Sequence, residues 1–125
     1  MKDITIMIPQ RDGAAPEVWD SLGAAGINVE AAVSFSRENS RVVHVVVEDA
    51  VADRAQQVLK AASLLIVDVR EVLLIPLEDR PGGLADVTRT ANEAGADVYL
   101  LSFATGNRVM LGAVNLEAAR EAFGL

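Results

Sequence analysis

Apolar and polar positions in the first half of the chain alternate with two different periods. Runs rich in valine and isoleucine are separated by segments whose apolar residues recur at helical spacing. The pattern predicts a strand at 3–9, a helix from Pro16 to Gly26, strands at 29–36 and 41–48, a helix from the N-cap Asp49 through Ala62, and a strand at 64–69. This β-α-β-β-α-β order is typical of a ferredoxin-like unit, in which two helices cover one face of a four-stranded antiparallel sheet.

The same pattern starts again after residue 69. It predicts a strand at 71–77, a polar loop, a helix at 84–94 that ends at Gly95, strands at 97–104 and 108–114, and a helix at 116–123 capped by Asn115. Short motifs recur as well: Gly26-Ile27-Asn28-Val29 matches Gly95-Ala96-Asp97-Val98, and Ile8-Pro9 matches Ile75-Pro76. A period of about 67–69 residues therefore predicts an α+β protein of two tandem units, 1–69 and 70–125, which share an interface because each is marginal alone.

The second unit has no counterpart of the strand at 64–69. In this fold the fourth strand covers the first, so the strand at 71–77 is expected to be an edge strand. Pro76 fits such an edge because it has no N–H to donate. An uncovered edge tends to pair with another chain, which predicts edge pairing or strand exchange in a homodimer. The alternative is that a longer chain was trimmed.

Composition excludes several kinds of site. The chain has 125 residues, a net charge of −7, no cysteine and one histidine, His44. Its basic residues are scattered, so no nucleic-acid surface is expected, and neither a thiolate nor a multi-histidine metal site can form. No cofactor is predicted. No apolar run reaches membrane-spanning length and the N-terminus has no signal-peptide pattern, so we expect a soluble cytoplasmic protein.

The loop after the strand at 71–77 carries the main functional signal. It contains Asp79, Arg80, Pro81, Gly82 and Gly83, and an apolar-periodic helix follows from Leu84. Pro81 fixes φ just before the helix, and the two glycines allow a sharp turn and the close approach of another molecule. The free N–H groups of Gly82, Gly83 and Leu84 are expected to attract an anion such as a carboxylate. A plain structural turn is the alternative.

With this loop, the repeated element order and a Gly-x-Asn/Asp motif after each first helix, the chain resembles a tandem pair of ACT domains. The resemblance covers almost the whole chain and is carried best by Asp79 to Ala85. In the first unit it rests on element order and on Gly26 to Val29, since the loop at 10–14 lacks the Pro-Gly pair. The resemblance implies a non-catalytic regulatory module that binds an amino acid at an interface between two units, with a metabolic enzyme as a possible partner.

The resemblance also implies two composite sites. In the first, loop 79–84 faces Asn28 and Val29 of a first unit; in the second, loop residues Asp12 and Gly13 face Asp97. Loop N–H groups would bind the ligand's carboxylate, Asp79 and Asp97 would accept from its ammonium, and Asn28 could do either. Each of these residues also has a purely structural interpretation, as part of a turn.

Three functions are considered for this sequence. The first is a regulatory protein that binds a free amino acid and signals occupancy by population shift. The second is a ligand-free module for dimerisation or for docking on an enzyme. The third is an enzyme on the same fold, such as an acylphosphatase using Arg80 and Asn107. Asn107 lies in a predicted turn and the loop is too short to wrap a phosphate, so no catalytic residue is predicted.

Overall fold

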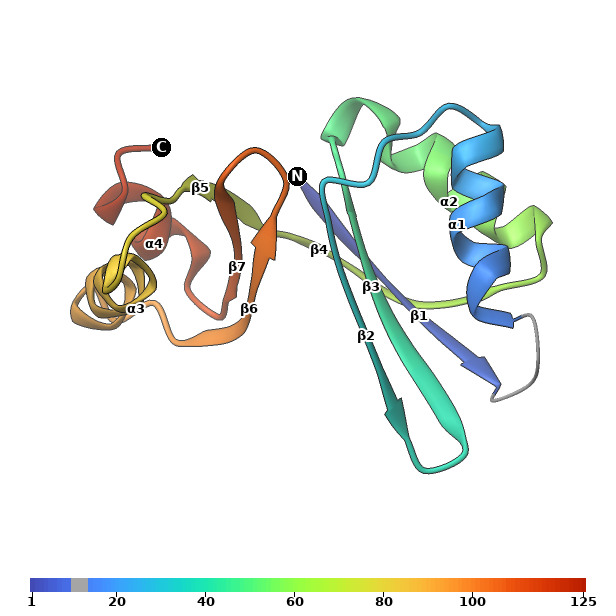
Figure 1. Cartoon of the computed structure of the whole chain (residues 1–125), viewed down its shortest axis with the longest axis horizontal. Coiled ribbons are helices and arrows are strands. Elements are labelled where there is room, and N and C mark those ends of the chain that lie inside the picture. The colour runs from blue at the N-terminus through green and yellow to red at the C-terminus, as the bar shows by residue number, and fades with distance from the viewer. Residues whose placement is uncertain (10–13) are drawn as a thin grey trace. The chain divides into compact units, whose positions relative to one another are not determined.

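Valine- and isoleucine-rich segments of the first 70 residues form a four-stranded sheet with two helices on one face (Figure 1). The computed structural model describes residues 1–9 and 14–125. Its first compact unit, unit 1, is Met1–Arg70. The elements are β1 (Lys2–Pro9), α1 (Ala14–Ala24), β2 (Ala31–Arg37), β3 (Ser40–Val47), the 3-10 turn η1 (Asp49–Val51), α2 (Ala52–Ala61) and β4 (Leu65–Glu71). The strand order β2-β3-β1-β4 makes β1 and β3 central.

Alternation along the central strands builds the core of unit 1. Ile4, Ile6 and Ile8 of β1 are buried on the same face as alternate valines of β3, because successive strand side chains point to opposite faces. Leu22 of α1 and Leu59 of α2 close over that face. Each such side chain contributes about 1.5–3 kcal/mol when fully buried, so the helix positions follow from the apolar stripe of the sheet.

The second compact unit, unit 2, is Glu71–Leu125 and repeats this plan with three strands. Its elements are β5 (Leu73–Pro76), α3 (Gly83–Glu93), β6 (Val98–Ala104), β7 (Arg108–Ala113) and α4 (Leu116–Ala122). The strand order is β5-β7-β6, and α3 and α4 lie on one face of the sheet (Figure 1). The predicted ferredoxin-like α+β class is confirmed.

The first helix of each unit ends in the same way. Gly26 and Gly95 both have φ of 71°, the left-handed conformation that glycine adopts at low cost. The next residues, Ile27 and Ala96, donate their N–H groups to the carbonyl five residues earlier, at 3.0 and 3.1 Å. The predicted helix ends at these two glycines are therefore confirmed, and the repeat extends to hydrogen-bond detail.

The second helices also end alike, on Ser63 (φ 62°) and Gly124 (φ 68°). Leu64 and Leu125 follow them and donate to the carbonyl five residues earlier, at 3.1 and 2.9 Å. Leu125 thus occupies the place of Leu64, the residue directly before β4. The described sheet of unit 2 has no strand at the place of β4, so β5 is an outer strand, as predicted.

The outer edge of β5 offers few hydrogen-bond donors. Leu77 donates its N–H to the carbonyl of Asn107 at 2.8 Å, so odd-numbered residues of this segment face β7. Leu74 and Pro76 therefore face outward, and Pro76 has no N–H. Leu74 is the single residue of β5 whose N–H points away from the described sheet.

One predicted helix cap is wrong. Asp49 does not cap α2, because a 3-10 turn intervenes and the N-cap position falls on Val51, which forms no side-chain cap. The Asp49 carboxylate instead lies 3.0 Å from the amino group of Met1. Some boundaries also differ by two residues: α1 begins earlier than predicted, at Ala14, while β2 begins later, at Ala31, β4 ends later, at Glu71, and β5 begins later, at Leu73.

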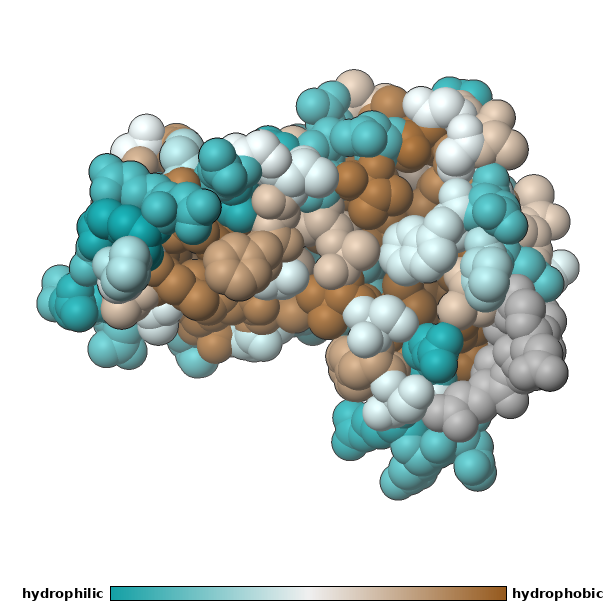
Figure 2. Space-filling model, viewed as in Figure 1, coloured by the Kyte–Doolittle hydropathy of each residue, from teal (hydrophilic) through white to brown (hydrophobic). Residues whose placement is uncertain are grey.

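Apolar side chains also remain on the surface of both units (Figure 2). On β4, Ile66 packs on the core of unit 1, whereas its neighbours Leu65 and Val67 point to the other face and are 61% and 47% exposed. Phe103 of β6 is exposed in unit 2. Within residues 1–9 and 14–125, no helix is long and apolar enough to cross a membrane.

The cap of α4 gives a first test. Asn115 accepts a hydrogen bond from the N–H of Ala118 at 3.2 Å, as its predicted role requires. Asn115→Ala should lower the free energy of unfolding by about 1 kcal/mol. Asn92→Ala, an exposed position inside α3, is the matched control and should change it by less than about 0.5 kcal/mol. Equal urea midpoints for the two variants would contradict the cap.

Candidate functional site

The loop between β5 and α3 contains two glycines, each required for a different structural reason. Gly82 has φ of 85° at the N-cap of α3, a conformation that other residues rarely adopt. Gly83 approaches the carbonyl of Glu78 so closely that a Cβ atom would lie 2.4 Å from that oxygen. The loop therefore requires glycine at both positions, whether or not a ligand binds.

Backbone N–H groups at the start of α3 are left without acceptors. Gly83, one of the predicted ligand donors, donates its N–H to the carbonyl of Arg80 at 3.1 Å and is therefore engaged within the loop. Among the residues that the structure describes, nothing accepts from the N–H groups of Gly82, Leu84 or Ala85, and no side chain caps the helix. The sequence analysis did not name Ala85 among the donors. Three orphan donors at a helix N-terminus attract an anion.

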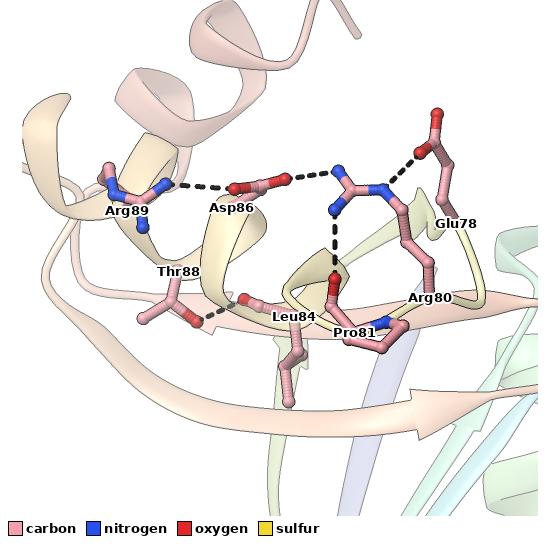
Figure 3. Close-up of polar contacts among 7 residues, drawn as sticks. All are labelled: Glu78, Arg80, Pro81, Leu84, Asp86, Thr88 and Arg89. Carbon is pink, nitrogen blue, oxygen red and sulfur yellow. Dashed lines mark hydrogen bonds and ion pairs between the residues drawn. The ribbon is translucent and has the colours of Figure 1, made fainter.

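Arg80 is tied to its own loop (Figure 3). Its Nε donates to Glu78 at 2.6 Å, its Nη2 to Asp86 at 2.5 Å and its Nη1 to the carbonyl of Pro81 at 3.2 Å. The hydrogen bond to Glu78, followed by that to Asp86, raises the pKa of Arg80. A guanidinium has five N–H groups, so two remain for another acceptor. The side chain is 48% exposed.

Asp86 accepts hydrogen bonds from two arginines (Figure 3). Besides the bond from Arg80, it accepts one from Arg89 at 3.0 Å. The Arg80 hydrogen bond, followed by the Arg89 hydrogen bond, holds the pKa of Asp86 below its ordinary value. The carboxylate is therefore ionised at neutral pH, and its charge is balanced by Arg80 of the loop and Arg89 of α3.

The remaining predicted residues of unit 2 do not gather around the loop. Asp79 is exposed, and in the described part of the chain no residue forms a hydrogen bond or ion pair with its side chain. Asp97 lies beyond the other end of α3, with φ of 58°. An 11-residue helix separates the two, which is about 16 Å of axial rise, so they do not share one site within unit 2.

In unit 1, Asn28 and Val29 lie in the turn after α1, at the place that Asp97 and Val98 hold in unit 2. The side-chain amide of Asn28 donates to Glu30 at 3.0 Å, and its oxygen keeps both lone pairs for other donors. Val29 is half-buried against the core. The predicted residues Asp12 and Gly13 lie outside the described residues.

One polar pair escaped the sequence analysis. His44 of β3 lies with its Nδ1 2.9 Å from a carboxylate oxygen of Asp3 and 3.3 Å from the hydroxyl of Thr5. Asp3 is 1% exposed, and Phe35 stacks on the imidazole with centroids 6.4 Å apart. The register of β1 against β3 makes this pair, and the sequence alone gave no signal for it. Among the described residues, no three His, Asp or Glu side chains group as metal ligands.

The two residues considered for phosphate chemistry have structural roles in unit 2. Asn107 has φ of 53° in the turn between β6 and β7, and its carbonyl accepts from Leu77 at 2.8 Å. Arg80 is bound to acceptors of its own loop. Both observations agree with turn and loop roles rather than with a phosphate cradle.

The chain is similar to proteins of one family over nearly its whole length. The family described as ACT domain pair matches residues 1–123. Protein BT0572 from Bacteroides thetaiotaomicron is 23% identical, with a TM-score of 0.84, over 98% of this chain and 85% of that chain. The ligand-free regulatory subunit of aspartate kinase from Thermus thermophilus is 19% identical, with a TM-score of 0.71, over 98% of this chain and 91% of that one. The corresponding subunit from Thermus flavus is 19% identical, with a TM-score of 0.66, over 98% and 90%. No curated protein has a significant sequence match.

The close approach at Gly83 predicts a stability effect. Gly83→Ala should lower the free energy of unfolding by about 1–3 kcal/mol, because the new methyl group must displace the backbone at Glu78. Gly23→Ala is the matched control: nothing lies within 4 Å of its Cβ position inside α1, and alanine there should stabilise by about 0.5–1 kcal/mol. Chemical denaturation measures both. A neutral Gly83→Ala variant would show that the loop does not need this contact.

The lowered pKa of Asp86 predicts a pH-dependent contribution. A depressed carboxylate pKa stabilises the folded state fully above the unfolded value, about 4, and that stabilisation is lost as pH falls through the folded value. Wild type should therefore be more stable than Asp86→Asn at neutral pH, and the difference should vanish in strong acid. Asp20→Asn, an exposed position on α1, is the control. Urea unfolding across the acid range tests this, and a difference independent of pH would refute it.

Proposed function

The chain belongs to the ACT domain pair family, and from that premise we propose that it is a non-catalytic regulatory protein that binds a free amino acid. The observation that supports this most is the N-terminus of α3. Three backbone N–H groups without described acceptors lie there, and the exposed Asp79 belongs to the same loop. Donors and an acceptor at one exposed loop match the two charged groups that every α-amino acid carries.

The proposed contacts follow from the loop. The ligand's carboxylate accepts from the N–H groups of Gly82, Leu84 and Ala85 and from the two spare N–H groups of Arg80. Its ammonium donates to Asp79. Pro81 and Gly83 maintain the conformation of the loop.

The loop covers only part of a ligand, so a second surface is needed. We keep the sequence-based proposal that Asn28 and Val29 of a first unit complete the site, and that Asp97 serves a reciprocal site with the loop containing Asp12 and Gly13. The length of α3, which separates Asp97 from loop 79–84, supports assigning the two to different sites.

A partner enzyme is the proposed receiver of the signal. Two of the similar structures are regulatory subunits of aspartate kinase. By analogy, we propose that this chain acts in the cytoplasm on an enzyme of amino-acid metabolism. Ligand binding would favour one of two arrangements of the chain, and the enzyme would respond to that allosteric shift.

A ligand-free assembly module is the second candidate, favoured by exposed apolar surface. Leu65 and Val67 leave an apolar stripe on β4, and β5 is an outer strand. Both features fit a homodimer, which the first candidate also accommodates. Pro76 limits the outer edge of β5 to the single N–H of Leu74, so side-chain packing would have to stabilise such a dimer.

A thermal-shift screen against the common L-amino acids tests the first candidate. A ligand that binds only the folded chain stabilises it by about 2.7 kcal/mol at a concentration 100 times its dissociation constant. We expect one or two amino acids to raise the melting temperature, and Asp79→Asn and Asn28→Ala to reduce the shift after subtraction of each variant's own ligand-free melting temperature.

Asp20→Asn is the matched control and should keep the full shift. A response that both Asp79→Asn and Asp20→Asn retain would place the ligand elsewhere. A flat response across the panel would favour the assembly module, and light scattering of the free chain would then measure its oligomeric state.

A further inference from the structure

Unit 1 has a hollow on the face of its sheet that the helices leave uncovered. The hollow measures about 300 Å³ and lies where β2 turns into β3. Met7 of β1 and Val42 of β3 form its floor and are directly opposite each other in the ladder. Ile6 and Ile8 point into the core, so Met7 must point to the opposite face. The rim is the hairpin itself: Arg37, Glu38, Asn39 and Ser40.

Two opposite charges on this rim have no described partner. No residue of the described chain forms a hydrogen bond or ion pair with the guanidinium of Arg37 or the carboxylate of Glu38. Glu38 has φ of 53°, a conformation in which residues other than glycine, asparagine and aspartate are uncommon. The hairpin thus presents a cation, an anion and the Asn39 amide around an apolar floor.

We propose that this hollow is a second ligand site, for a small zwitterion with a short apolar side chain, such as an aliphatic L-α-amino acid. Arg37 binds the carboxylate, Glu38 binds the ammonium, and Met7 and Val42 pack against the aliphatic part. A guanidinium matches a carboxylate in shape as well as charge, and a carboxylate accepts from an ammonium. Met7 is 38% exposed and Val42 half-buried, so apolar area remains for a ligand to cover.

The size of the hollow limits the ligand. A water molecule takes a share of about 30 Å³ in the liquid, so the hollow corresponds to roughly ten waters. That accommodates a molecule of the size of leucine. Both charged residues are exposed, and exposed ion pairs contribute little, so a dissociation constant in the millimolar range is expected.

The site shares no residue with loop 79–84, so the two proposals can fail separately. A titration of the ¹⁵N-labelled full chain followed by amide NMR reads both sites in one spectrum. L-leucine up to about 10 mM should shift the amides of Met7, Arg37 to Ser40 and Val42. Shifts at 79–86 report the other site. If the hairpin amides do not move, the proposal is overturned, whatever happens at the loop.

Three analogues remove one feature of leucine each. 4-Methylpentanoate lacks the ammonium, 3-methylbutylamine lacks the carboxylate, and glycine lacks the apolar side chain. Each should bind the hairpin about tenfold more weakly than leucine, since a hydrogen bond to a charged group or a packed side chain is lost. Equal binding of leucine and all three analogues would show non-specific contact and overturn the proposal.

Matched variants test which charged residue binds which group of the ligand. Arg37→Gln should weaken leucine binding at the hairpin about tenfold and leave 3-methylbutylamine unaffected; Glu38→Gln should weaken leucine but leave 4-methylpentanoate unaffected. Arg54→Gln on α2 and Glu93→Gln on α3 remove the same charges elsewhere and should change neither. Loss of leucine binding in a control variant to the same extent as in Arg37→Gln would overturn the assignment. These positions are exposed, so the variants are expected to fold, which the dispersion of the same spectra verifies.

Discussion

Each unit depends on a tight reversal of the chain where a helix ends and the next segment begins. Every α-helix that the structure describes ends on a residue of positive φ, and the residue after it donates its N–H to the carbonyl five residues earlier. This hydrogen bond satisfies a carbonyl that the helix cannot satisfy itself. It also turns the following side chain back toward the sheet: Ile27, Leu64 and Ala96 are buried. Each helix can therefore pack on the sheet to which the neighbouring strands belong. The same reversal occurs in both units.

The order of the elements and these reversals could be predicted from the sequence because they are local. Gly26 and Gly95 end apolar-periodic segments, and Asn115 precedes one, so each signal lies within a few residues of its effect. Contacts that depend on register could not be predicted. Asp3 meets His44 only because β1 pairs with β3 at one alignment out of several, and 41 residues separate them. The cap predicted at Asp49 is absent because a 3-10 turn places the N-cap of α2 on Val51, and the Asp49 carboxylate lies near the amino group of Met1 instead.

The two helix-to-strand turns are alike in backbone and unlike in chemistry. In unit 1, the side-chain nitrogen of Asn28 is engaged by Glu30, which is itself buried, and only the amide oxygen remains for a further donor. In unit 2, Asp97 adopts a left-handed conformation and uses its carbonyl to accept from Val114 at 2.9 Å. Its carboxylate is exposed. The motif that the sequence repeats therefore gives two non-equivalent surfaces: an amide next to a buried acid in one unit, and a full negative charge in the other.

The same distinction bears on the ligand that we propose for loop 79–84. Backbone N–H groups recognise a carboxylate that all amino acids share, so the start of α3 cannot discriminate one from another. Leu84 is the apolar side chain that the loop itself exposes. Asp79 adds negative charge to the same loop, Glu78 is paired with Arg80, and the charge of Asp86 is balanced by Arg80 and Arg89. The second carboxylate of an acidic ligand would be repelled by the acidic side chains of the loop. Arg80 is the one cation of the loop that could offset this repulsion. If the proposed site is occupied by an amino acid, the chemistry of the loop favours a neutral one over aspartate or glutamate, and the choice among neutral ones would fall to the second surface that we propose.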